Sequence, residues 1–104
     1  MKQPYLIVTM PDQSRWAVPV AIIAQNRATY YAHRTSYGSV NRSLIDDTLQ
    51  LFASDPYEIH DWAANNMNWS TASMFARRLG SPPEPDFQEG WCNGDWEVAD
   101  LEAL

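Results

Sequence analysis

The first twenty residues alternate between apolar runs and one short polar break. Residues 5–10 read YLIVTM, a run rich in β-branched and aromatic side chains that is typical of a strand. The next residues, PDQS, place Pro11 and Asp12 where a turn favours them, and RWAV then resumes the apolar pattern. This order predicts an antiparallel hairpin spanning residues 4–18.

Helical spacing follows the hairpin. Pro19 suits the first turn of a helix, because its φ is fixed and its missing N–H needs no partner there. No Gly or Pro occurs in residues 20–37, and one helical stripe is formed by Val20, Ile23, Ala24, Arg27 and Tyr31. The β-branched residues at the start leave a longer strand open as the alternative. The pattern favours the helix.

Two further helices are predicted over residues 43–67. Ser43 has the side chain of an N-cap, and the residues after it form an apolar face at Leu44, Ile45, Thr48, Leu49 and Phe52. The second helix has a start signal at Asp55, Pro56 and Glu58, which fit the cap, the first helical position and the capping box. Trp62 falls on its inner stripe and is therefore expected in the core.

The remainder of the chain is less periodic. Either Ser70 caps a third helix that ends at Gly80, or Asn68 ends the previous helix in a left-handed conformation and a strand follows. SPPEP (81–85) interrupts regular structure, NGD (93–95) favours a turn and WEV (96–98) a short strand. We therefore expect one α+β domain over residues 1–104, in which an N-terminal β-hairpin packs on two or three short helices and an aromatic-rich C-terminal segment completes the core.

The distribution of charge indicates which classes of partner the protein could bind. The net charge is −6, but residues 1–42 hold five basic residues and one acidic residue, whereas residues 43–104 hold two and twelve. An excess of negative charge repels phosphates, so nucleic-acid binding is not expected. The acidic surface either keeps the protein soluble or faces a basic protein partner. No apolar run is long enough for a membrane helix, and a single cysteine fits a reducing cytoplasm.

Candidate chemistry is sparse. His33 and His60 show no metal-binding spacing, so neither a metal nor another cofactor is expected. Cys92 could be a nucleophile assisted by His60 and Asp61, but it has no protease signature and its acidic neighbours disfavour the thiolate. A carboxylate pair for acid–base work could come from five residues, Glu84, Asp86, Glu89, Asp95 and Glu97, but the sequence pairs none of them. No catalytic residue is assigned, and the protein is not expected to be an enzyme.

A cluster of amide and indole side chains is the remaining candidate. Asn65, Asn66, Asn68 and Trp69 lie in the segment WAANNMNWS, and Trp91 lies in a second aromatic segment. Exposed, these side chains would make an aromatic centre inside a polar rim, which suits protein recognition. The structural alternative is a helix end whose asparagines bond loose carbonyls. These five residues are the candidate binding residues.

The segments DWAANNMNW and DFQEGWCNG, with PDQSRWAVPVAIIAQNRATYYA before them, resemble a group of small uncharacterised proteins encoded by phages and prophages. The resemblance implies a phage or mobile-element origin and a bacterial host cell, and it carries over no catalytic residue. Three functions follow as hypotheses. The first is a non-enzymatic accessory protein that binds another protein. The second is an inhibitor of a host defence or nucleic-acid enzyme through an acidic, DNA-mimicking face, and the third is a small enzyme using Cys92 or a carboxylate pair.

Overall fold

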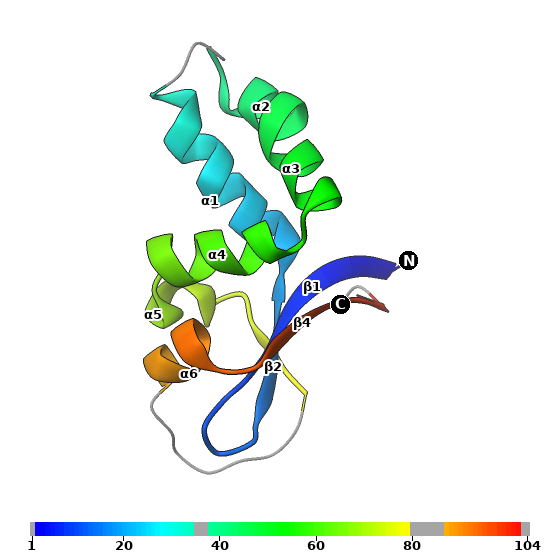
Figure 1. Ribbon diagram of the computed structural model, residues 1–104, viewed down its shortest axis with the longest axis vertical. Coiled ribbons are helices and arrows are strands. Elements are labelled where there is room, and N and C mark those ends of the chain that lie inside the picture. Colours follow the sequence, from blue (N-terminus) through cyan, green and yellow to red (C-terminus); the bar gives the residue numbers. More distant parts are fainter. Residues whose placement is uncertain (1, 35–37, 80–86, 103–104) are drawn as a thin grey trace.

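The computed structural model describes residues 2–34, 38–79 and 87–102, apart from the side chains of Phe87 and Glu89. Four antiparallel strands form its sheet: β1 (Lys2–Thr9), β2 (Arg15–Pro19), β3 (Arg77–Arg78) and β4 (Trp96–Glu102). The strand order is β3-β2-β1-β4, so the C-terminal strand pairs with the N-terminal one (Figure 1). The predicted hairpin is confirmed as β1 and β2, and the predicted strand at WEV is confirmed as the longer β4.

Pro4 lies in this sheet without disturbing its hydrogen bonds. Met10 N–H donates to Ser14 O and Thr9 N–H donates to Asp95 O, so even-numbered residues of β1 bond toward β2 and odd-numbered ones toward β4. Pro4 thus turns its nitrogen toward β2, one residue beyond the last β1–β2 pair, Tyr5 with Pro19. A missing N–H costs little where the ladder has already ended.

The helices pack on one face of the sheet, and the fold is α+β (Figure 1). Their bounds are α1 (Val20–Ala32), α2 (Val40–Ser43), η1 (Leu44–Thr48), α3 (Leu49–Ser54), α4 (Tyr57–Asn66), α5 (Trp69–Ala72) and α6 (Phe87–Asn93). The helix predicted after Pro19 is confirmed as α1. The two helices predicted over residues 43–67 are confirmed as the continuous run α2–η1–α3, in which η1 is a π-helical turn, and as α4.

The first of these two runs begins earlier than predicted. Ser39 is its N-cap, since Ser39 Oγ accepts a 3.1 Å hydrogen bond from Arg42 N–H, whereas Ser43 is fully buried one turn later. The predicted apolar face is also partly wrong: Thr48 and Phe52 are buried, but Ile45 and Leu49 are 51% and 45% exposed. The π turn takes more residues per turn than an α-helix, so Ser43 and Thr48, which are five positions apart, both face inward.

The start of α4 follows its local signal. Asp55 Oδ1 accepts a 3.2 Å hydrogen bond from Tyr57 N–H, and Pro56 has a φ of −60°, which suits the first turn. The backbone N–H of Asp55 already donates to Leu51 O at 2.8 Å. The Asp55 N–H, to which a capping-box glutamate would bond, is therefore already satisfied by α3. The two helices α3 and α4 follow each other with almost no linker.

Residues 68–79 contain parts of both alternatives. A single helical turn, α5, is followed by the two-residue strand β3. Asn68 is extended, with φ −103° and ψ 151°, so the left-handed conformation predicted for it is wrong. Instead, Trp69 N–H donates a 2.7 Å hydrogen bond to Gln88 Oε1 from α6. This contact between distant segments starts α5.

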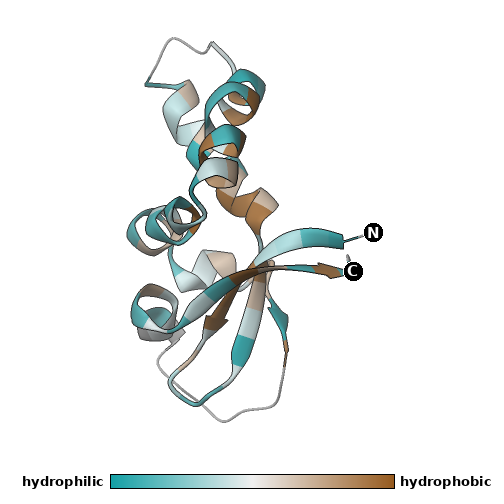
Figure 2. Ribbon diagram, turned by 45° about the vertical axis from the view of Figure 1, so that its right-hand side comes forward, coloured by the Kyte–Doolittle hydropathy of each residue, from teal (hydrophilic) through white to brown (hydrophobic). Residues whose placement is uncertain are grey.

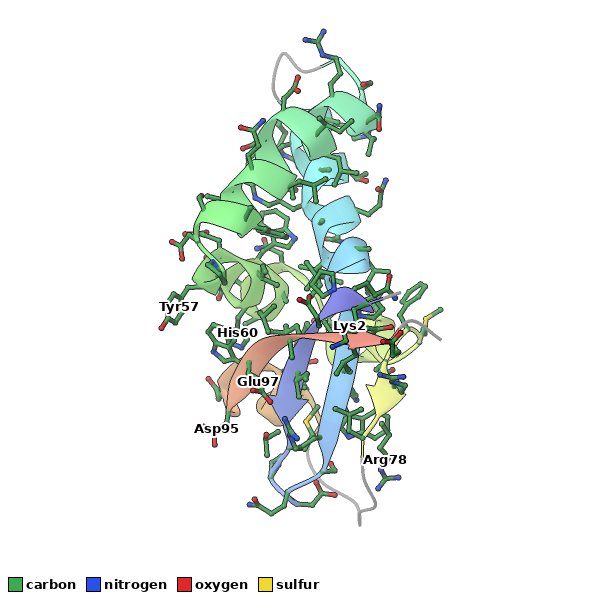
Figure 3. All side chains as sticks on the ribbon, turned by 90° about the vertical axis from the view of Figure 1, so that its right-hand side faces the viewer. Lys2, Tyr57, His60, Arg78, Asp95 and Glu97 are labelled. Atoms are coloured by element: carbon green, nitrogen blue, oxygen red, sulfur yellow. The ribbon has the colours of Figure 1, made fainter. Side chains whose placement is uncertain are left out.

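The core lies between the helices and the sheet, and hydrophobic residues concentrate on the strands and the start of α1 (Figure 2). Trp62 is confirmed as a core residue. Trp91 from α6 is fully buried, and its Nε1–H donates to the carbonyls of Ala63 and Met67 at 3.1 and 3.2 Å. On the other face of the sheet, a small cluster of Tyr5, Ile7 and Ala17 is buried without a described helix above it (Figure 3).

Candidate functional site

The candidate residues from the sequence do not form one surface. Trp69 and Trp91 are only 8% and 0% exposed, so the prediction that their indoles are exposed is wrong. Both indoles pack in the core, with ring centroids 5.8 Å apart. Neither can form the centre of a recognition surface, because each already serves the packing of α4, α5 and α6.

Asn65, Asn66 and Asn68 are exposed, as expected. Asn65 Nδ2 donates to Asp61 O at 2.8 Å, and Asn66 Nδ2 donates to Trp62 O at 3.1 Å. Asp61 O and Trp62 O lie in the last two turns of α4, where they also face the backbone N–H groups of Asn65 and Asn66. The asparagine side chains thus bond to helix carbonyls, as the structural interpretation expected, but these are not the unpartnered carbonyls of the helix end.

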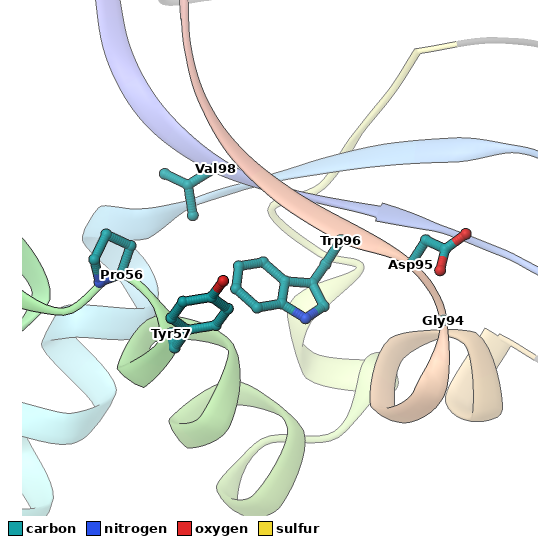
Figure 4. Close-up of a pocket in the computed structure, with 6 residues that line it drawn as sticks. All are labelled: Pro56, Tyr57, Gly94, Asp95, Trp96 and Val98. Carbon is teal, nitrogen blue, oxygen red and sulfur yellow. The ribbon is translucent and has the colours of Figure 1, made fainter.

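A different aromatic group lies at the surface between α4 and β4. An open hollow of about 830 Å³ is lined by Pro56, Tyr57, Gly94, Asp95, Trp96 and Val98 (Figure 4). The rings of Tyr57 and Trp96 stand nearly perpendicular, at 88°, with centroids 5.4 Å apart. Tyr57 is 73% exposed. We call this feature the Tyr57–Trp96 hollow.

Local structure fixes both rings. Tyr57 is the first residue of α4, where Asp55 holds its backbone N–H. Trp96 is the first residue of β4 and follows the bend at Gly94, whose N–H donates to Gly90 O at 2.9 Å. A Cβ at position 94 would overlap the carbonyl oxygen of Thr9, so the chain enters β4 along this path only with glycine. The starts of α4 and β4 therefore hold the two rings of the hollow in place.

His60 forms the inner wall of this aromatic group. It lies one turn after Tyr57 on α4, and its ring stacks on Trp96 with a centroid distance of 5.0 Å and an interplanar angle of 6°. Burial lowers the pKa of His60, because the imidazolium form loses hydration there, although the backbone of Trp91 and the charge of Asp61 oppose this. The lowered pKa favours the neutral form of the ring that stacks on Trp96.

Carboxylates edge the hollow. Asp95 lines it, and Asp55 lies at the backbone of Tyr57. Figure 3 shows Tyr57, His60, Asp95 and Glu97 on one side of the molecule, away from Arg78. Asp55 and Asp95 take part in no ion pair within the described part of the chain, so this side carries negative charge next to exposed aromatic surface.

Elsewhere, ion pairs join the basic and acidic halves of the sequence. Arg27 Nη1 lies 2.9 Å from Asp47 Oδ2, and Arg15 pairs with Glu97. Arg15 on β2 and Glu97 on β4 meet because these two strands lie on either side of β1. Arg27 reaches Asp47 because α1 packs against the 40–54 helix. The two halves therefore do not make separate charged faces, and negative charge left over collects locally, as at the hollow.

A second surface groove of about 690 Å³ lies between α1, α4 and the segment after α5. Trp62 and Met67 line it, and Asn66 is the one candidate residue from the sequence that reaches it. Its lining side chains carry no charge, and Tyr30 and Phe75 are exposed beside it. This groove offers apolar surface and amide groups.

Among the residues that the structure describes, no hydrogen bond links Cys92 to His60 or Asp61. Cys92 Sγ donates to Ala64 O at 3.4 Å and accepts from Gln88 Nε2 at 3.3 Å, whereas His60 stacks on Trp96. Glu84 and Asp86 lie outside the described residues, as does the side chain of Glu89, and Asp95 and Glu97 are exposed to solvent. Within residues 2–34, 38–79 and 87–102, no three His, Cys, Asp or Glu side chains are placed to hold a metal ion. None of the helices described is long and apolar enough to cross a membrane.

The sequence indicated the local structure on each side of the hollow, but not that the two sides meet. Alternation in WEVADLE places Trp96 and Val98 on one face of a strand, and Asp55-Pro56 places Tyr57 in the first turn of a helix. Nothing in the pattern brings these two segments together. Compared with protein-family models, curated proteins and solved structures, the chain finds no match, so the site's geometry has to carry the functional argument.

Proposed function

We propose that this chain is a non-enzymatic accessory protein of phage or prophage origin, which acts in the bacterial cytoplasm by binding another protein through the Tyr57–Trp96 hollow. The observation that carries the proposal is the exposed ring of Tyr57, which stands perpendicular to the half-buried ring of Trp96 and lines an open hollow with it. Tyr and Trp are the side chains that most often dominate binding energy at protein interfaces, because they bury a large area at a small entropic cost.

The stacking of His60 supports this role. With its inner face against His60, Trp96 needs little reordering when a partner arrives, and a preformed contact surface loses less entropy on binding. Asp55 and Asp95 add negative charge at the rim, which favours a partner with a basic contact region and speeds encounter at low salt. The negative charge at the rim is thus the reason to expect a partner with a basic contact region.

The experiment uses the intact protein as bait in a bacterial lysate, identifies the partner by mass spectrometry and then measures binding with both proteins purified. Tyr57→Ala removes an exposed ring at the hollow, so its fold is expected to persist. The matched control is Phe75→Ala, which removes an exposed ring at the uncharged groove. Circular dichroism and thermal melting establish that both variants are folded.

The expected result is a loss of affinity of about tenfold or more for Tyr57→Ala, with Phe75→Ala close to wild type. Raising the salt concentration should slow association. Wild-type affinity for Tyr57→Ala would remove the hollow as the binding site. Loss with Phe75→Ala alone would move the site to the groove.

A further inference from the structure

The outer edge of the sheet runs beside the Tyr57–Trp96 hollow. Among the described strands, β4 has β1 as its one neighbour, so its other edge is open. Thr9 N–H donates to Asp95 O, and the residue pairs of an antiparallel ladder alternate between bonded and non-bonded. The backbone groups of Glu97, Ala99 and Leu101 therefore point toward β1, and those of Trp96, Val98 and Asp100 point outward.

Two of the three residues whose backbone groups point outward, Trp96 and Val98, also line the hollow with their side chains. Both side chains pack on the helix side of the sheet. A chain that hydrogen-bonds to the open edge of β4 would direct alternate side chains to this side of the sheet, toward Tyr57 and Trp96. Edge and hollow thus offer backbone bonding and side-chain contact in one place.

We infer that β4 binds an extended, basic segment of a partner protein, which adds to the sheet as a fifth strand and places a Lys or Arg side chain in the Tyr57–Trp96 hollow. This inference rests on the proposed function and specifies its binding mode. Strand addition obtains affinity from main-chain hydrogen bonds and specificity from pockets for alternate side chains. An ammonium or guanidinium group gains from aromatic ring faces as well as from carboxylates.

Charge along the strand selects the occupant. β4 contains Glu97, Asp100 and Glu102 and follows Asp95, and Asp95 and Asp100 have no ion pair in the described part of the chain. A second copy of this chain, paired through the same strand, would bring these carboxylates together and is disfavoured. An extended segment with lysine or arginine at alternate positions neutralises them.

The test titrates ¹⁵N-labelled protein with a blocked hexapeptide of alternating valine and lysine, and measures amide hydrogen exchange by NMR. Exchange at Trp96, Val98 and Asp100 should slow by about tenfold or more, while Glu97, Ala99 and Leu101 are already protected by β1. Two control peptides should fail to slow it: the same sequence N-methylated at every residue, and a valine–glutamate hexapeptide.

A pair of protein variants separates backbone from charge. Asp100→Pro removes an outward N–H without breaking a bond to β1, and should lower peptide affinity severalfold more than Asp100→Asn, which keeps that N–H. Should the proline variant not fold, the comparison of the methylated and unmethylated peptides still decides the matter. Sedimentation of the protein alone, showing a dimer held through β4, would contradict the inference.

Unchanged exchange at Val98 and Asp100 with saturating peptide, or equal protection by the acidic peptide, would overturn the inference. This failure is distinguishable from failure of the proposed function. If the identified partner loses affinity for Tyr57→Ala but leaves the β4 amides unprotected, the hollow binds without strand addition. If the partner ignores Tyr57→Ala, the proposed function itself fails.

Discussion

The indole Nε1–H of Trp62 donates a 2.8 Å hydrogen bond to Oδ1 of Asn26 and so joins α4 to α1. The Trp62 ring also packs against Tyr30 and Tyr31, with centroid distances of 5.4 and 5.7 Å. This residue links the two helices through both packing and a polar contact.

Replacing Trp62 should therefore be costly. Trp62→Ala is expected to lower the free energy of unfolding by about 3–5 kcal/mol, and Asn26→Ala by about 1 kcal/mol through the lost hydrogen bond. Urea denaturation followed by circular dichroism measures both. Asn65→Ala, which alters an exposed asparagine on α4, is the matched control and should change stability little. Equal stability of Trp62→Ala and wild type would show that the ring does not hold α1 against α4.

Ser39 and Ser43 should respond in opposite ways to alanine. Ser39→Ala removes the N-cap of α2 and is expected to cost about 1 kcal/mol. Ser43 Oγ is buried with no partner in the described structure, so Ser43→Ala removes an unsatisfied hydroxyl and should be neutral or stabilising by about 1 kcal/mol. Thermal melting of both variants decides between the two caps. Destabilisation by Ser43→Ala alone would favour the start predicted from sequence.

Gly94 should tolerate no side chain. A Cβ there would overlap Thr9 O and lie 2.5 Å from Gly90 O, and both obstacles are backbone atoms. Gly94→Ala is expected to destabilise the protein by about 1–3 kcal/mol or more. Gly38→Ala is the control: it has a φ of +80° but no atom within 4 Å of the new Cβ, so about 1 kcal/mol of backbone strain is its main cost. Chemical denaturation should rank Gly94→Ala as the more damaging, and the reverse order would mean that β1 yields at Thr9.

The protonation of His60 should couple stability to pH. Because burial lowers its pKa from 6.5 in the folded state, the folded protein binds fewer protons than the unfolded chain just below pH 6.5. The stabilisation from neutral His60 is therefore present above pH 6.5. It is lost as the pH falls from 6.5 toward the pKa that His60 has in the folded protein. Between about pH 7.5 and 5.5, wild type should lose more stability than His60→Phe, which keeps a ring on Trp96 but cannot titrate.

An NMR titration checks the same prediction directly. The midpoint for the His60 ring in the folded protein should lie below its midpoint in urea-unfolded chain. A higher midpoint in the folded state would mean that the Trp91 backbone and the charge of Asp61 outweigh the loss of hydration, and wild type would then gain stability relative to His60→Phe as the pH falls.

Local signals in the sequence determined several elements of this fold. The hairpin follows from two apolar runs around Pro11 and Asp12, and α1 and α4 begin beside Pro19 and Asp55-Pro56 as predicted. Such features involve residues within about four positions of each other, so the chain specifies them before it packs. Trp62 was also predictable as a core residue, because its helical stripe is apolar.

Tertiary structure decided what the sequence pattern could not. Trp69 and Trp91 are buried because α6 packs on α4 and α5, and Ser43 lies inside because the 40–54 helix turns one face to α1. The Tyr57–Trp96 hollow joins the start of a helix to the start of a strand 39 positions later. The meeting of distant segments depends on the packing of the whole core, and hydrophobic burial has no direction that a local pattern could record.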